Sequence, residues 1–91
     1  MDTAGYPDDQ ELARIQAWPH DDFRGLMEFV HSLWHNTEWG WTQGRYTSYH
    51  LSTGGWSGNE SLIGALQLNT MFWLTCWEKS SKGGHYEFLV P

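Results

Sequence analysis

The chain has 91 residues and a formal net charge of −6 at pH 7; 40% of its residues are hydrophobic, and it holds one cysteine. This length suits one small domain, and a single cysteine excludes a disulfide-stapled fold and a cysteine-based zinc finger. No window approaches the roughly 20 apolar residues that a membrane-spanning helix needs, and the acidic start lacks the basic region of a signal peptide. We therefore expect one soluble domain over residues 1–91, located in the cytoplasm.

The negative charge is concentrated in residues 1–38, which hold eight acidic residues against two basic ones. Over residues 39–91 the acidic and basic residues balance. Such a chain repels nucleic acid on average, because affinity for phosphates comes from cationic side chains. The expected partner is therefore a protein with a basic surface, rather than nucleic acid or a membrane.

Two helices are predicted in residues 1–38. Asp8, with Glu11 three residues later, forms a capping-box pattern at the start of the first helix. The second helix is expected to start after a cap at Asp21 and to run to about His35. One face of it is apolar, with residues at helical spacing: Phe23, Leu26, Met27, Val30, Leu33 and Trp34. This part of the chain thus forms an acidic helical hairpin.

Residues 45–91 are predicted to form a β-α-β-β unit. Its elements are, in chain order, a strand over 45–51, a helix over 58–69, and strands over 71–78 and 85–90. Ser57 and Glu60 match a capping box at the start of the helix. The helix is long enough for a right-handed crossover, so the first two strands would be parallel. The predicted fold class is α+β, with two N-terminal helices and a small three-stranded mixed sheet packed with helices.

Side-chain alternation assigns two faces to the last two strands. The face expected in the core is wholly apolar and comprises Phe72, Leu74, Cys76, Tyr86, Phe88 and Val90. The opposite face carries Trp73 and Trp77, which belong to the core if helices cover them and otherwise form an exposed aromatic platform. The strand over 71–78 is apolar on both sides, as a central strand would be. An unpaired edge on an outer strand would allow a homodimer.

A resemblance rests on the run LSTGGWSGNE at residues 51–60 and on the pair Trp77-Glu78 ahead of the Gly-Gly turn. The segment that holds them, residues 50–86, resembles small uncharacterised proteins encoded in tailed-phage and prophage genomes. The resemblance implies a bacterial cell carrying phage genes as the setting. It implies no activity and no assigned site.

The leading hypothesis for function is a non-enzymatic interaction protein. Its acidic hairpin would engage a basic surface on a host or phage protein, and tryptophans of the 36–44 connection would supply anchors. One concrete form is an inhibitor of a nucleic-acid-binding enzyme, with carboxylates standing in for phosphates. The predicted partner-binding residues are Asp8, Asp9, Glu11, Asp21, Asp22, Trp39 and Trp41.

The Gly-rich loop over residues 52–60 supports an alternative, a small-ligand module for a nucleotide or a sugar. Glycines allow a tight turn, and the N–H groups of a helix start can hold an anion. However, no lysine follows the glycines as in a Walker motif, and Glu60 would repel a phosphate. The candidate ligand-binding residues are Trp56 as a stacking platform, Ser57, Asn59 and His85.

An enzyme is not expected, because no acid, base and nucleophile converge in the sequence. Glu28, His31 and His35 follow the i, i+3, i+7 spacing of a stripe beside the apolar helix face, and they could hold a divalent metal. Ser32 stands where a metalloprotease motif needs glutamate. Cys76 is expected to be a buried structural thiol. We therefore predict no cofactor and no metal.

Overall fold

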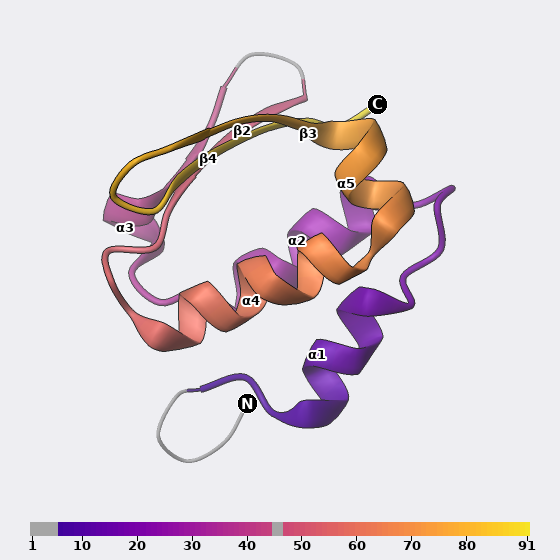
Figure 1. Cartoon of the computed structure of the whole chain (residues 1–91), viewed down its shortest axis with the longest axis horizontal. Helices are drawn as coiled ribbons and strands as arrows, with labels where there is room; N and C mark the ends of the chain where they lie inside the picture. Colours follow the sequence, from indigo (N-terminus) through magenta and orange to yellow (C-terminus); the bar gives the residue numbers. More distant parts are fainter. Residues whose placement is uncertain (1–5, 45–46) are drawn as a thin grey trace.

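The computed structural model describes residues 6–44 and 47–91 (Figure 1). Its elements in this part of the chain are α1 (Asp9–Gln16), α2 (Phe23–Leu33), α3 (Thr37–Gly40), β1 (Trp41–Gln43), β2 (Ser48–Ser52), α4 (Ser57–Leu68), α5 (Thr70–Cys76), β3 (Trp77–Ser81) and β4 (His85–Leu89). The strands form an antiparallel sheet in the order β1-β2-β4-β3. The α+β class is confirmed, whereas the three-stranded mixed sheet is wrong. The short strand β1 adds a fourth member, and every strand pair in the described residues is antiparallel.

Helix α1 begins with the predicted capping box. The Glu11 backbone N–H donates to Asp8 Oδ1 at 2.8 Å, and the Asp8 N–H donates to Glu11 Oε1 at 2.9 Å. Ile15 is the buried residue of this helix. Trp18 follows α1 and stacks on Phe29 of α2, with ring centroids 5.4 Å apart. This stack links the end of α1 to α2, whereas α1 itself packs mainly against α4.

Helix α2 is confirmed, with small corrections at both ends. Its cap is Asp22 rather than Asp21, since Asp22 Oδ1 accepts a hydrogen bond from the Gly25 N–H at 3.2 Å. The helix ends at Leu33, two residues before the predicted His35, because the next residue has extended backbone. Its predicted apolar face is buried throughout.

The largest correction concerns residues 71–78, which were predicted as a strand. They form most of α5 and the start of β3. As positions i and i+4 of a helix, Phe72 and Cys76 are both buried, whereas Leu74, predicted on the same face, is 78% exposed. Asn69 caps this helix, because its Oδ1 accepts from the Phe72 N–H at 3.2 Å. The prediction failed because a run that is apolar on every side fits the two-residue repeat of a strand as well as the 3.6-residue repeat of a helix.

Helix α4 is confirmed and begins at Ser57. The capping box predicted there is wrong, because Ser57 already lies inside the helix and the N-cap residue is Trp56, which makes no side-chain cap hydrogen bond. The turn into the helix depends on Gly54 and Gly55, whose φ angles of 64° and 75° suit glycine. The predicted terminator, Asn69, is the C-cap.

Strands β3 and β4 form the predicted hairpin. Gly83 and Gly84 occupy its turn with φ angles of 93° and 81°. Trp77 pairs with Phe88, and Cys76, which was expected on the apolar face of this hairpin, belongs to α5 instead. β3 is an edge strand rather than the predicted central strand, and β2 and β4 occupy the centre of the sheet.

Two further elements lie in the connection predicted over residues 36–44, namely α3 and β1. A Cβ atom at Gly40 would collide with the Ser52 carbonyl oxygen and would lie 3.1 Å from Trp34 Nε1, so α3 can approach β2 this closely only with glycine there. The strand predicted over residues 45–51 corresponds to β2, and its first two predicted positions lie outside the described residues.

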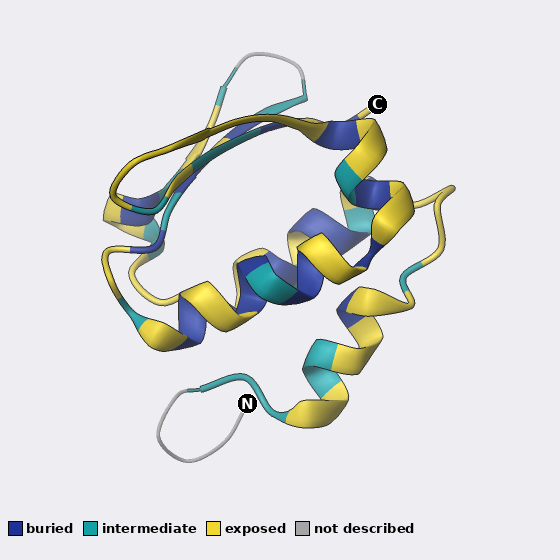
Figure 2. Cartoon of the chain, in the orientation of Figure 1, coloured by how far each residue is buried: buried dark blue, intermediate teal, exposed yellow. Residues whose placement is uncertain are grey.

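The core lies between one face of the sheet and the helices, with α1 packed on the far side of α4 (Figure 1). Figure 2 shows that buried residues line the inner sides of these elements. The core comprises Ile15, Phe23, Leu26, Met27, Val30, Leu33, Trp34, Tyr49, Leu51, Leu62, Ile63, Ala65, Leu66, Phe72, Cys76, Phe88 and Val90. A polar row crosses the other face of the sheet, where His50 pairs with Glu87 at 3.5 Å.

Candidate functional site

The acidic residues at the start of α1 are partly engaged within the chain. Asp8 and Glu11 are half-buried and form the capping box, whereas Asp9 is exposed. The hydrogen bond from the Glu11 backbone N–H lowers the pKa of Asp8 below its ordinary value of 3.8. Of these three predicted partner-binding residues, Asp9 is therefore the one with a solvent-exposed side chain.

The turn between α1 and α2, residues 18–22, is a second acidic region, and we refer to it as the acidic turn. Asp21 and Asp22 are both exposed. The turn is held in place because Trp18 Nε1 donates to the Asp22 carbonyl oxygen at 2.8 Å. The Arg14 guanidinium lies 5.1 Å from the Trp18 ring centroid and adds a cation–π contact. Two carboxylates thus stand on a fixed turn.

The two tryptophans predicted as partner anchors have different surroundings. Trp39 is 61% exposed and lies against Gly54, where an added Cβ would be 3.1 Å from the indole ring. Trp41 is half-buried and packs edge-to-face with His31 and Tyr49, at centroid distances of 4.9 and 6.0 Å. Only Trp39 offers most of its side chain to solvent.

The Gly-rich loop holds most of its predicted ligand residues in internal contacts. Trp56 stacks with Tyr6 and with His35, at centroid distances of 4.9 and 4.3 Å. Asn59 is buried: its Oδ1 accepts from the His35 N–H at 2.8 Å, and its Nδ2 donates to the His35 carbonyl at 3.0 Å. Ser57 is exposed. The Asn59 amide therefore fixes the end of α2 against this loop.

His85 stands apart from the loop pocket. It pairs with Ser52 across β2 and β4, and the Ser52 hydroxyl lies 2.6 Å from His85 Nδ1. The pocket itself has a volume of about 280 Å³ and is lined by His35, Asn36, Trp39, Thr53, Gly54, Gly55 and Trp56. The structure thus brings Trp56 together with Trp39, which the sequence had assigned to a different site.

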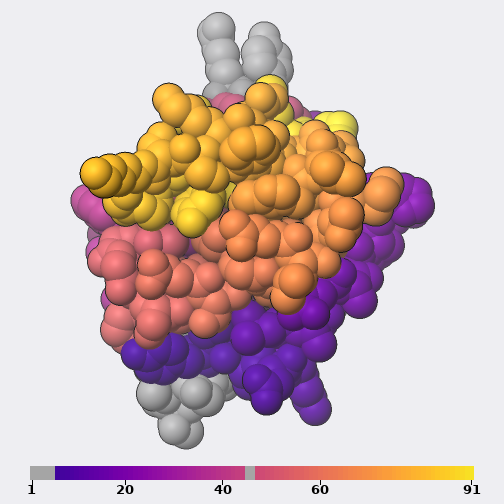
Figure 3. All heavy atoms as spheres, in the orientation of Figure 1, coloured from indigo at the N-terminus to yellow at the C-terminus, as the bar shows by residue number. Residues whose placement is uncertain are grey.

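The segment formed by the end of α4, by α5 and by the start of β3 exposes several large apolar side chains. We call it the α5 face and define it by four residues with their exposed fractions: Leu68 at 67%, Met71 at 55%, Leu74 at 78% and Trp77 at 42%. They recur every three residues. Trp73, half-buried beside them, stacks on Trp77 with centroids 6.0 Å apart. Figure 3 shows this segment, in orange, on the face of the molecule turned to the viewer.

Asn69 places the α5 face beside the acidic turn. Its Nδ2 donates to the carbonyl oxygens of Ile15 at 2.9 Å and of Trp18 at 3.3 Å. The α4–α5 junction is therefore tied to the end of α1, and in Figure 3 the orange and indigo atoms adjoin at this edge. Leu68 precedes Asn69 and Met71 follows it by two residues, so the α5 face begins where the chain is tied to Trp18, the first residue of the acidic turn.

The sequence prediction missed the α5 face. It assigned Leu74 to the core and left Trp73 and Trp77 open between core and exposed platform. Of these two, the structure makes Trp73 half-buried and Trp77 exposed. Asn69 was the available signal, since an Asn that ends one helix can also cap the next.

Neither a metal centre nor a reactive thiol is evident in the described part of the chain. No group of three or more His, Cys, Asp or Glu side chains is placed to hold a metal ion there. Burial raises the pKa of the Cys76 thiol to about 11, which disfavours the nucleophilic thiolate at neutral pH. This agrees with the buried structural role predicted for Cys76.

Comparison of the chain with protein-family models, with curated proteins and with solved structures finds no match. Among the described residues, no helix is both long enough and apolar enough to cross a membrane.

Proposed function

We propose that this chain is a non-enzymatic protein-interaction domain that binds its partner on the α5 face. The observation that carries the proposal is the regular exposure of Leu68, Met71, Leu74 and Trp77. Single exposed apolar residues are ordinary on protein surfaces, whereas a contiguous apolar patch marks an interaction site. Helix α5, with the sequence TMFWLTC, also has no charged residue that would make this surface polar.

The size of the exposed side chains suits an interface. Burying a Leu, Met or aromatic side chain contributes roughly 1.5–3 kcal/mol. Four such side chains offset a substantial part of the entropy cost of association. Trp77 is also held in place, because its Nε1 donates to Ser80 Oγ at 2.8 Å and its ring stacks on Trp73. A fixed tryptophan loses little side-chain entropy on binding, which favours a role as anchor.

Charge indicates the chemistry of the partner. The α5 face borders the acidic turn with Asp21 and Asp22, and the chain carries a net charge of −6. A partner surface that combines apolar and basic side chains complements both features. A second copy of the chain would carry the same negative charge, which opposes self-association. The proposed occupant is therefore a different protein with a basic, apolar surface.

The resemblance of residues 50–86 to phage and prophage proteins supports a setting for this interaction. We place the domain in the cytoplasm of a bacterial cell that carries phage genes, with a host or phage protein as the partner. An inhibitor of a nucleic-acid-binding enzyme would use Asp21 and Asp22 in place of phosphates.

Site-specific photo-crosslinking tests the proposal. A benzophenone amino acid at position 74 should capture a protein from nuclease-treated bacterial lysate, and the same group at position 42, on exposed β1, serves as the control. The captured protein, purified, should bind the wild-type chain and lose binding to Leu74→Lys. Equal capture from both positions would contradict the proposal. Crosslinked pairs of this chain would instead identify a second copy as the occupant.

A small-ligand site at the Gly-rich loop is the second candidate function. The pocket of about 280 Å³ between Trp39 and Trp56 favours it. Because Trp56 already stacks with two rings, Trp39 is the better stacking platform for a nucleotide or sugar. Trp39→Ala should then remove binding of such a ligand without unfolding the chain. Unchanged binding in that variant would exclude this pocket.

A further inference from the structure

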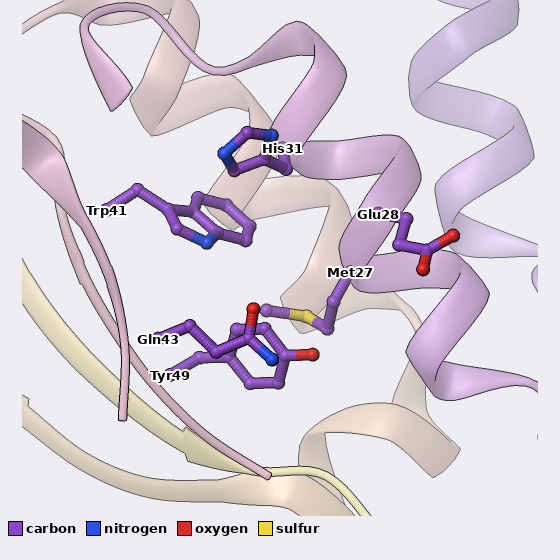
Figure 4. A pocket seen from close by; sticks show the side chains of 6 residues that line it. All are labelled: Met27, Glu28, His31, Trp41, Gln43 and Tyr49. Atoms are coloured by element: carbon purple, nitrogen blue, oxygen red, sulfur yellow. The ribbon is translucent and has the colours of Figure 1, made fainter. Parts of the chain in front are cut away.

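A second pocket lies between α2 and the β1–β2 pair, away from the surfaces that the proposed function uses. Its volume is about 400 Å³, and it is lined by Met27, Glu28 and His31 of α2, by Trp41 and Gln43 of β1, and by Tyr49 of β2. Figure 4 shows the α2 side chains on one side of the space and those of the two strands on the other. This volume lies in the range of small-molecule pockets.

The Tyr49 hydroxyl is the first sign that this pocket is built to hold a ligand. Tyr49 is only 6% exposed, and its ring packs edge-to-face against Trp41. Yet among the residues that the structure describes, its hydroxyl has no hydrogen-bond partner. Figure 4 shows it pointing from β2 toward α2. The oxygen itself is not among the buried unpartnered atoms, so it is accessible from the pocket to a donor group of a ligand.

Two further polar groups in the pocket are also without a partner in residues 6–44 and 47–91. They are the carboxylate of Glu28 and the side-chain amide of Gln43. With the Tyr49 hydroxyl, they supply acceptor oxygens from three separate elements, α2, β1 and β2. Such convergence from different elements is typical of a binding site.

The charge of the pocket favours a cation. Glu28 is the one lining residue with a formal charge at pH 7. Burial raises the pKa of Tyr49 above its ordinary value of 10.0, so the phenol stays neutral at pH 7; Arg24 opposes this rise and Glu28 adds to it. The charge of Arg24 therefore acts on Tyr49, although Arg24 is not one of the residues that line the pocket. The Trp41 and Tyr49 rings add an aromatic surface that attracts cations.

We propose that the pocket between α2 and the β1–β2 pair binds a guanidinium group. A guanidinium is planar and carries five N–H donors, which suits a carboxylate together with separate hydroxyl and amide acceptors. Glu28 would accept two of the N–H groups, the Gln43 and Tyr49 oxygens would accept others, and Met27 would contact the apolar stem. An ammonium carries three N–H donors on one atom and lacks this planar fork, so it matches such acceptors less well. Two sources share this chemistry, an arginine side chain of a protein and a free guanidine compound.

NMR titration of the 91-residue chain tests this proposal. The probes are arginine with both backbone ends blocked, the equally blocked lysine, and propylguanidine as a free guanidine compound of the same charge. We expect saturable shifts of the Trp41 indole and Gln43 amide signals with both guanidine probes, and weaker effects with lysine. Tighter binding of blocked arginine than of propylguanidine would indicate a protein side chain as the source, and the reverse order a free compound.

Matched variants complete the test. Glu28→Gln and Tyr49→Phe keep the shape of the pocket and should each weaken binding of blocked arginine about tenfold or more. Glu60→Gln, an exposed carboxylate on α4, should leave binding unchanged. Leu74→Lys should also leave it unchanged, because the α5 face is a separate surface. The proposal is overturned by equal binding of lysine, by the absence of saturable shifts, or by wild-type affinity in Glu28→Gln.

Discussion

Helices α2 and α5 are both rich in apolar residues, yet they divide them differently between core and solvent. In α2 five apolar residues, Phe23, Leu26, Met27, Val30 and Leu33, are buried, Phe29 is half-buried against Trp18, and exposed positions such as Arg24 and Glu28 are charged. In α5, Phe72 and Cys76 are buried, whereas Met71 and Leu74 face solvent. No charged residue lies in α5.

This difference separates residues that stabilise the fold from residues that remain available for binding. The apolar face of α2 is matched to the core, so its contribution is to folding. The α5 face adds nothing comparable to the core, because its side chains remain in water. An apolar surface that the fold does not bury, next to the acidic turn, is the basis of the proposed interaction.

Alanine substitutions should show the largest contrast. Leu26→Ala removes a fully buried side chain of α2 and should lower the free energy of unfolding by about 2–5 kcal/mol. Leu74→Ala should change it by no more than about 0.5 kcal/mol, because the side chain is 78% exposed. Chemical denaturation of both variants measures the difference. A similar loss in the two would mean that Leu74 belongs to the core.

Thiol labelling sharpens the same contrast within one helix. In a Leu74→Cys variant at pH 8, the new thiol should react with iodoacetamide about a hundredfold faster than Cys76, whose pKa of about 11 leaves little thiolate. Peptide mapping by mass spectrometry separates the two sites. Comparable rates would show that α5 opens readily or is oriented differently.

The link between the two regions should also be measurable. Asn69→Ala removes the cap of α5 and the hydrogen bonds to the Ile15 and Trp18 carbonyl oxygens. The expected loss in the free energy of unfolding is roughly 1–3 kcal/mol. The neighbouring Gln67→Ala, at an exposed position of α4, is the matched control and should have little effect. Equal stability of both variants would show that the Asn69 hydrogen bonds do not connect the α5 face to the acidic turn.

The smallest expected effect concerns the capping box of α1. Because the pKa of Asp8 is lowered in the folded chain, its carboxylate stabilises the fold above pH 3.8. That contribution is lost as the pH falls through the folded-state pKa. Asp8→Ala should therefore lower the melting temperature modestly at pH 7, and the difference from wild type should disappear at strongly acidic pH. A difference that does not depend on pH would indicate that the carboxylate charge is not involved.

Much of the fold could be predicted from the sequence because its local signals are strong. The capping-box pattern of Asp8 and Glu11 predicted the start of α1, and the helical spacing of the apolar residues predicted α2. The prediction failed where those signals are ambiguous. The segment 71–78 is apolar on both faces, so its pattern does not distinguish a helix from a strand. Strand β1 has only three residues, which is too short for a recognisable pattern.

The candidate sites were harder to predict, because each depends on contacts between distant residues. Asn59 suggested a ligand group, but its amide is used to hold His35, 24 residues earlier in the chain. The α5 face could not be identified while Leu74 was assigned to the core. The pocket lined by Glu28, Gln43 and Tyr49 joins three elements, one of which, β1, was not predicted.

The most direct test of the central claim is an amide NMR titration of the 91-residue chain with an amphipathic helical peptide of leucine and lysine. A peptide of leucine and glutamate is the matched control. We predict saturable shifts at residues 68–77 and at Asp21 and Asp22 with the lysine peptide, and loss of these shifts in Leu74→Lys. No saturable shifts, shifts confined to other surfaces, or equal binding of the glutamate peptide would contradict the account.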